Sequence, residues 1–138
     1  EQQTAWNAVV TLCDEFKNAD KYVMSLPMWN FGIPYKLKHY LDLIAQPGQT
    51  FSFSPETGYS GLVTDKPIVT IYARGGSYSA GGAQGTDYQT SYLEMLLGFL
   101  GFKDIRSIVI EPTMADPDEV AKVEEAAKAL AKEIAKKF

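Results

Sequence analysis

The chain has very little of the residue types on which metal sites and covalent cross-links depend. Its 138 residues include one cysteine, Cys13, and one histidine, His39. A single cysteine cannot close an internal disulfide, and no group of cysteines and histidines has the spacing of a metal site. We therefore expect a protein without a metal in a reducing cytoplasm, with Cys13 as a small buried hydrophobe and His39 as a surface or packing residue rather than a catalytic acid or base.

An excess of positive charge is also lacking. Lysine and arginine number 13 against 17 aspartate and glutamate residues, which gives a formal net charge of -4. Because binding to a phosphate backbone requires a clustered cationic surface, the sequence argues against a nucleic-acid partner. Long hydrophobic runs are missing too, since none approaches the ~20 residues needed to cross a bilayer. The sequence therefore argues against a membrane span.

What is present is the composition of one globular domain over residues 1–138, with 46% hydrophobic and 22% charged residues. Apolar spacing predicts helices that alternate with strands along the chain. We expect helices over residues 4–18, 34–44, 86–100 and from 116 onward, and strands over 21–26, 68–72 and 107–111. The strand over 21–26 has the near-continuous apolar pattern of a strand buried on both faces. Such alternation predicts an α/β/α fold of three layers around a parallel sheet.

The last helix has the clearest start signal. Asp116 is the expected N-cap, Pro117 takes the first helical position, and Glu119 completes a capping-box pattern. Its apolar face is expected to comprise Val120, Val123, Ala127, Leu130 and Ile134. Residues 49–62 are rich in glycine, serine and proline instead, and they predict a loop with a short hairpin.

Two unusual loops follow predicted strands, PMWNFG at residues 27–32 and ARGGSYSAGG at residues 73–82. The carboxyl ends of parallel strands are where such sheets bind ligands. In the first loop, Trp29 and Phe31 beside Asn30 offer flat apolar faces and an amide, which suit a planar heteroaromatic ligand. In the second, glycines allow the backbone to approach a ring closely. Either loop alone is equally consistent with a purely structural role, but two at one sheet edge favour a binding site.

These motifs resemble a known family. PMWNFGIPYKLKHYLDLIAQPGQTFSF, followed by ARGGSY and then by YLEMLLGFLGF, is similar to the FMN-dependent NADH:azoreductases, relatives of the NAD(P)H:quinone reductases with a flavodoxin-like fold. The resemblance covers nearly the whole chain. It implies that the flavin ring is held on one side by Pro27, Met28, Trp29, Asn30 and Phe31, and on the other by Ala73, Arg74, Gly75 and Gly76. It also implies that a substrate pocket is lined by Phe53, Tyr78 and Phe99.

The chain departs from this family at its start. The family begins with a strand and a serine-rich loop whose helix N-terminus holds the FMN phosphate, and nothing here corresponds to them. We therefore expect the N-terminal βαβ portion of the fold to be absent from these 138 residues. In the flavodoxin-like strand order 2-1-3-4-5, the segment 21–26 is then the third strand and lies at an exposed apolar edge.

The resemblance implies an FMN-dependent oxidoreductase that passes two electrons from NAD(P)H through the flavin to quinones or azo compounds, without a dedicated acid or base. It further implies a homodimer with the pocket at the subunit interface. A second hypothesis is a non-catalytic flavodoxin-like module, either an electron carrier or a partner-binding fragment. The long segment around residues 50–62 favours the enzyme, whereas the missing phosphate loop favours inactivity of these residues alone.

Overall fold

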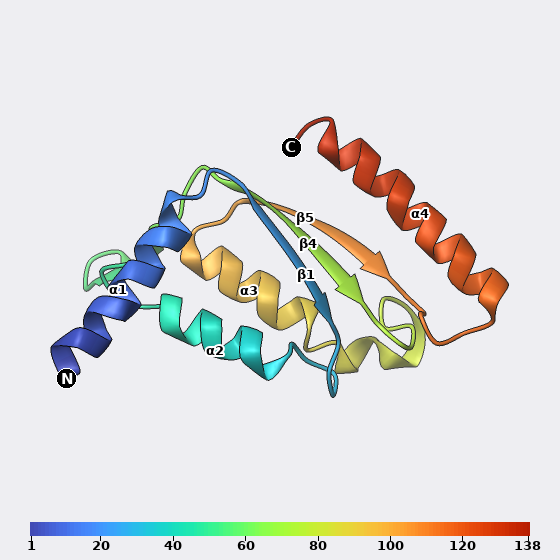
Figure 1. Ribbon diagram of the computed structural model, residues 1–138, viewed down its shortest axis with the longest axis horizontal. Coiled ribbons are helices and arrows are strands. Elements are labelled where there is room, and N and C mark those ends of the chain that lie inside the picture. Colours follow the sequence, from blue (N-terminus) through green and yellow to red (C-terminus); the bar gives the residue numbers. More distant parts are fainter.

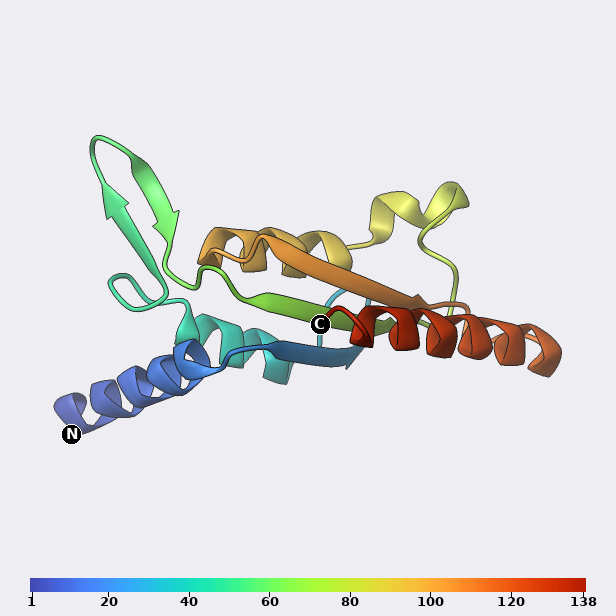
Figure 2. The same ribbon diagram turned by 90° about the horizontal axis from the view of Figure 1, so that it is seen from above.

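In the computed structural model, the chain forms three layers, with a parallel sheet between helices (Figure 1). The strand order is β1–β4–β5, comprising β1 (Tyr22–Pro27), β4 (Pro67–Ala73) and β5 (Asp104–Ile110). Helices α2 (Tyr35–Ile44) and α3 (Thr90–Leu100) cover one face, and α4 (Pro117–Ala135) covers the other (Figure 2). Helix α1 (Gln2–Asn18) projects beyond the amino end of the sheet, and its last turns pack against α2 and the end of the core. The structure describes residues 1–138, apart from the side chains of residues 81, 82 and 84. The predicted α/β fold with a parallel sheet is confirmed.

The central strand β4 divides the core in two. Its side chains alternate, so that Ile68 and Tyr72 face α1, α2 and α3, whereas Val69 and Ile71 face α4. The larger core comprises Cys13, Phe16, Tyr22, Leu26, Leu41, Ile44, Val63, Ile68, Tyr72, Leu93, Leu97, Leu100 and Phe102. The smaller core, under α4, comprises Val69, Ile108 and Ala127. The layer of three helices therefore supplies most of the buried apolar surface.

Strand β1 is an edge strand. It pairs in parallel with β4, and in the described part of the chain it has no second partner strand. Tyr22 and Leu26 point into the larger core, but Val23 on the opposite face is 64% exposed. The prediction that this strand is buried on both faces is wrong, because α4 packs over β4 and β5 and leaves the outer face of β1 uncovered. The predicted apolar edge is present.

The helix boundaries follow local capping. Helix α3 begins at Thr90 rather than at residue 86, because the Asp87 carboxylate accepts the N–H groups of Gln89 and Thr90 at 3.1 and 2.9 Å. A short 3-10 helix, η1 (Gly81–Thr86), precedes it. At α4 the predicted N-cap is confirmed, since the Asp116 side chain accepts the Asp118 N–H at 3.0 Å.

Two further predictions have different outcomes. The expected hairpin is confirmed as β2 (Phe51–Ser54) and β3 (Gly58–Gly61), an antiparallel pair that extends away from the sheet. Leu130, expected on the apolar face of α4, is instead 45% exposed. Only a narrow stripe of α4 contacts the sheet, through Ala127, Ala131 and Ile134, and Leu130 lies beside that stripe. That part of the prediction is wrong.

Candidate functional site

The loops after β1 and β4 start side by side at the carboxyl edge of the sheet, because Pro27 pairs with Ala73 in the parallel register (Figure 1). A hydrogen bond continues this pairing into the loops, since the N–H of Met28 donates to the Ala73 carbonyl oxygen at 2.9 Å. Open α/β sheets bind ligands at this edge. The fold thus brings together the two loops that the sequence singles out.

The first loop is a tight two-residue turn. Trp29 and Gly32 exchange two backbone hydrogen bonds of 3.0 Å each. The central residues, Asn30 at φ 47° and Phe31 at φ 70°, both have left-handed backbones, as a type I′ turn requires. Asparagine tolerates this conformation well, and glycine usually follows it. Here phenylalanine occupies the glycine position.

The backbone of Phe31 is therefore strained. A left-handed conformation costs a residue with a side chain about 1–2 kcal/mol relative to the right-handed one. The Phe31 carbonyl oxygen accepts the N–H of Tyr88 at 3.0 Å, which helps to hold the turn. Its ring is 50% exposed and meets the ring of Tyr78 edge-on, with centroids 6.3 Å apart. Strain that presents an exposed aromatic ring is typical of a binding site.

A cleft of about 490 Å³ lies between the two loops. Its lining consists of Met28, Asn30, Phe31, Gly75, Gly76, Tyr78 and Met114. The volume is in the range of small-molecule sites, and the lining combines aromatic and thioether surface with one amide. A planar ring with hydrogen-bonding edges fits these properties.

The two glycines of the second loop are not required by the fold itself. Neither has a left-handed φ, and a Cβ on Gly76 would meet only the Tyr78 ring, at an ordinary 3.5 Å. A Cβ on Gly75 would meet the flexible end of Met114, whose Sδ lies 3.0 Å away. Among the described residues, the N–H groups of Gly75 and Gly76 have no acceptor. The glycines therefore leave open backbone donors beside the cleft.

Arg74 lies beneath this loop with its side chain 1% exposed. Its Nε donates to Gln89 Oε1 at 3.0 Å, Nη1 to the Glu111 carboxylate at 3.2 Å, and Nη2 pairs with the Asp87 carboxylate at 3.0 Å. Nη2 also donates to Thr90 Oγ1. The guanidinium is thus enclosed by groups of the chain and directed away from the cleft.

The backbone of Arg74 is equally occupied. Its N–H donates to the Ile110 carbonyl oxygen at 3.0 Å, and its own carbonyl oxygen accepts both the N–H and the hydroxyl of Thr113, at 2.8 and 2.9 Å. Of the predicted residues in this loop, Gly75 and Gly76 line the cleft, whereas Arg74 supports them from below.

Glu111 was missed by sequence reasoning. Burial by itself raises the pKa of its carboxyl, but hydrogen bonds from the Ser79 side chain and from the N–H groups of Tyr78 and Ser79, together with the charge of Arg74, hold the pKa below its ordinary value. The carboxylate form is therefore favoured. A lone glutamate at the end of a strand gives no sequence signal for such a role.

Phe53 and Phe99 lie outside the cleft between the two loops. The Phe99 ring is 4.8 Å from that of Phe51 and 5.6 Å from that of Tyr59, and the Phe53 ring is 5.0 Å from Tyr59. This aromatic cluster is at the hairpin, whereas the loop after β4 lies at the other end of the sheet (Figure 2). Within one chain, Tyr78 lines the cleft, and Phe53 and Phe99 do not.

A second aromatic cavity, of about 540 Å³, lies on the other side of the first loop. Its lining consists of Trp29, Asn30, Gly32, Ile33, Tyr35, Lys38, Tyr88 and Tyr92. Trp29 thus faces this second cavity and is not part of the lining of the cleft beside the glycines. Pro27, at the end of β1, lines neither of them.

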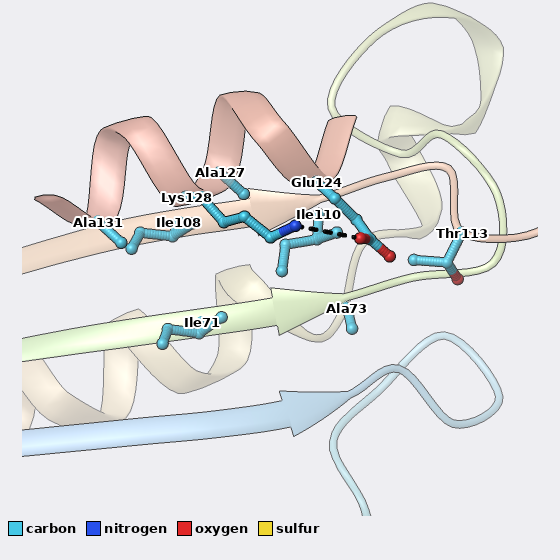
Figure 3. Close-up of a pocket in the computed structure, with 9 residues that line it drawn as sticks. All are labelled: Ile71, Ala73, Ile108, Ile110, Thr113, Glu124, Ala127, Lys128 and Ala131. Carbon is cyan, nitrogen blue, oxygen red and sulfur yellow. Dashed lines mark ion pairs between the residues drawn. The ribbon is translucent and has the colours of Figure 1, made fainter. Parts of the chain in front are cut away.

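A third cavity, of about 410 Å³, lies between α4 and the sheet (Figure 3). Its floor is formed by Ile71, Ile108 and Ile110, and the small side chains of Ala127 and Ala131 leave the space open. The charged groups drawn there, Glu124 and Lys128, pair with each other at 3.5 Å. This apolar lining offers few partners to the edges of a polar heteroaromatic ring, so the cleft between the loops remains the candidate site.

Cys13 and His39 both lie outside the cleft. Cys13 is fully buried on α1, and burial raises the pKa of its thiol. His39 is exposed on α2. In the described part of the chain, no group of three or more histidine, cysteine, aspartate or glutamate side chains is arranged to hold a metal ion. None of the described helices combines the length and apolar character needed to cross a membrane.

The chain is similar to proteins of known name and structure. A relative named FMN-dependent NADH:quinone oxidoreductase, from Nitratidesulfovibrio vulgaris strain DP4, is 55% identical over 126 residues, which are 91% of this chain and 60% of the relative. The solved structure of an azoreductase from Bacillus anthracis strain Sterne has a TM-score of 0.91 at 34% identity, covering 99% of this chain and 65% of that one.

A second solved structure is described as an FMN-dependent NADH-azoreductase from Bacillus anthracis strain Ames Ancestor in complex with FMN. It has a TM-score of 0.78 at 36% identity, covering 94% of this chain and 64% of that one. The chain thus spans less than two thirds of the length of each of these proteins. The resemblance predicted from the two loop motifs is confirmed. A family model, Flavodoxin_2, described as flavodoxin-like fold, matches residues 1–134, and the chain therefore belongs to this flavodoxin-like family.

Proposed function

We propose that the protein containing this chain is an FMN-dependent oxidoreductase that passes two electrons from NAD(P)H to quinones or azo compounds. The observation that carries the proposal is the cleft between the strained Asn30-Phe31 turn and the Gly75-Gly76 loop, with its open backbone donors. The names of the relatives support the same chemistry, since they are FMN-dependent NADH:quinone oxidoreductases and azoreductases.

The residues of the cleft fit a flavin ring. A Cβ at Gly76 would project into space beside Tyr78 that the protein leaves free, and the N–H groups of Gly75 and Gly76 can donate to ring carbonyls and nitrogens. Phe31 and Met28 supply apolar surface for the ring faces, and the Asn30 amide can donate or accept at an edge. When bound, FMN supplies the redox chemistry.

The task left to the chain is binding, orientation and exclusion of water. Among the described residues that line the cleft, none is a carboxylate or an imidazole. This lining suits hydride transfer without an acid or base from the protein. The turn and the glycine loop are fixed to the ends of β1 and β4, so the ring would be held by rigid elements, which favours precise orientation of the reacting faces.

We propose further that the active protein is a homodimer in the cytoplasm. Phe53 and Tyr59 are exposed on the hairpin, at the end of the sheet opposite the cleft. For Phe53 and Phe99 to line a substrate pocket, as the family resemblance implies, they must come from a partner subunit, while Tyr78 comes from the subunit that holds the flavin. The buried free thiol of Cys13 is consistent with a reducing compartment. The alternative of a non-catalytic electron carrier gains no support from the names of the relatives.

The proposal is tested by Gly76→Val in the whole protein, with Gly98→Ala as the matched control. Valine at position 76 should weaken FMN binding about tenfold or more, because its branched side chain occupies the ring space, while the protein stays folded. Gly98 lies in α3 with open space around its Cβ, so Gly98→Ala should keep wild-type FMN affinity. Flavin fluorescence titration measures the affinity and NADH oxidation with a quinone measures the activity. Wild-type FMN affinity in Gly76→Val would contradict the proposal.

A further inference from the structure

The carboxylate of Glu111 is the centre of a contact network that the proposed reaction does not use directly. It follows the last residue of β5, and its side chain is 9% exposed. Oε2 accepts the N–H of Tyr78 at 2.9 Å and pairs with Arg74 Nη1 at 3.2 Å, and Oε1 accepts the N–H of Ser79 at 2.7 Å. Both carboxylate oxygens are therefore occupied by the loop after β4.

The segment after Glu111 holds the same loop from its other end. Thr113 donates its N–H and its hydroxyl to the Arg74 carbonyl oxygen, and the N–H of Met114 donates to the Gly75 carbonyl oxygen at 3.0 Å. The loop is thus fixed at residues 74–75 through contacts with Thr113 and Met114, and at residues 78–79 through one carboxylate. Between these two attachments lie Gly76 and Ser77, so Gly76 is held from both sides.

Charge makes the carboxylate attachment the stronger one. Hydrogen bonds from N–H groups to a carboxylate are roughly twice as strong as those between neutral groups. Among the side chains that the structure describes, Arg74 is the only cation in this network, and it also pairs with Asp87. Removing the charge of Glu111 leaves Asp87 as a partner for Arg74, so the buried guanidinium keeps one counter-ion.

We propose that Glu111 is a positioning residue for the flavin site, which fixes residues 75–79 so that the N–H groups of Gly75 and Gly76 stay directed at the ring. This inference rests on the proposed function of the cleft. Glu111 itself does not line the cleft. It acts on the ligand by holding the loop in its binding conformation before the ligand arrives, which lowers the entropy lost on binding.

The test uses Glu111→Gln and Glu111→Asp in the whole protein, with Glu94→Gln as the matched control. Glutamine keeps the length and removes the charge, and aspartate keeps the charge but is one methylene too short to reach both N–H groups. Glu94 is a partly buried carboxylate on α3 that accepts the Ser107 hydroxyl at 2.5 Å, and it does not line the cleft. Two readouts are needed, namely FMN affinity and hydrogen exchange at individual amides.

Both Glu111 variants should lower FMN affinity about tenfold or more. They should also speed exchange of the Tyr78 and Ser79 amides about tenfold or more, while amides within β4 exchange as in the wild type. A merely structural role would instead speed exchange in β4 as well. Wild-type FMN affinity, or unchanged exchange at Tyr78 and Ser79, would overturn the inference. If the wild-type protein itself binds no FMN, the proposed function fails, and the exchange data alone still decide whether Glu111 fixes the loop.

Discussion

At the scale of single residues, the site depends on a conformation that its sequence disfavours. Phe31 has φ 70° at the position of a type I′ turn where glycine is usual. The strain of about 1–2 kcal/mol is already present in the folded protein before any ligand binds, so it lowers the stability of the fold. What the protein gains is an aromatic ring held at the mouth of the cleft, beside Tyr78.

Replacing Phe31 with glycine should therefore separate stability from binding. Glycine removes the strain of about 1–2 kcal/mol. Its greater conformational freedom in the unfolded chain lowers the free energy of unfolding by about 0.5–1 kcal/mol. The free energy of unfolding of the FMN-free protein should stay equal or rise by up to about 1.5 kcal/mol, whereas FMN affinity should fall. Denaturant unfolding and fluorescence titration measure the two quantities.

Asp65 provides the control, because it also has a left-handed backbone, at φ 60°, but does not line the cleft. Asp65→Gly should leave FMN affinity unchanged. If Phe31→Gly lost more than about 1 kcal/mol of stability or kept full FMN affinity, the reading of Phe31 as a strained ligand-facing residue would be wrong.

Single residues also show which parts of the site could be predicted from the sequence and which could not. The two loops were found because prolines, glycines and aromatic residues stand out at the ends of apolar runs. The burial of Arg74 could not be found, because its partners Asp87 and Glu111 are 13 and 37 residues further along the chain and no periodicity links them. Phe53 and Phe99 were expected to line a pocket, but their place in the aromatic cluster of the hairpin depends on tertiary packing that no local pattern reports.

At the scale of elements, the hairpin is positioned by a close contact between two glycines. A Cβ on Gly61, at the end of β3, would lie 2.3 Å from the backbone nitrogen of Gly101, just after α3. Gly101 has φ 119° and ends the helix, and a Cβ there would lie 2.9 Å from the Val63 carbonyl oxygen. The strand exit and the helix end can approach this closely only as glycines. Sequence periodicity predicted both elements but could not predict their contact.

Gly61→Ala and Gly98→Ala should have opposite effects on stability. Alanine at 61 meets backbone atoms that cannot move independently, so the free energy of unfolding should fall by about 1–3 kcal/mol. Alanine at 98 meets open space within α3 and should raise the free energy of unfolding by about 0.5–1 kcal/mol. Denaturant unfolding of both variants checks the pair. Equal effects of the same sign would show that the contact at Gly61 does not constrain the hairpin.

At the scale of the whole molecule, the fold separates a well-covered face from a sparsely covered one. Helices α2 and α3 pack on one face of the sheet, with the end of α1 beside them, and on the other face α4 covers β4 and β5 and leaves Val23 of β1 exposed. The alternation of apolar runs was enough to predict the layers, but it could not show how far α4 extends across the sheet. An exposed apolar edge strand is a surface on which further strands can pair.

The central claim is that the flavin ring binds between the loops after β1 and β4. The most direct test is a crystal structure of the whole protein with FMN bound. The account predicts the ring in the cleft lined by Met28, Phe31 and Tyr78, with its polar edge within hydrogen-bonding distance of the Gly75 and Gly76 N–H groups. A ring bound instead in the neighbouring aromatic cavity, between Tyr35 and Tyr92, would contradict it.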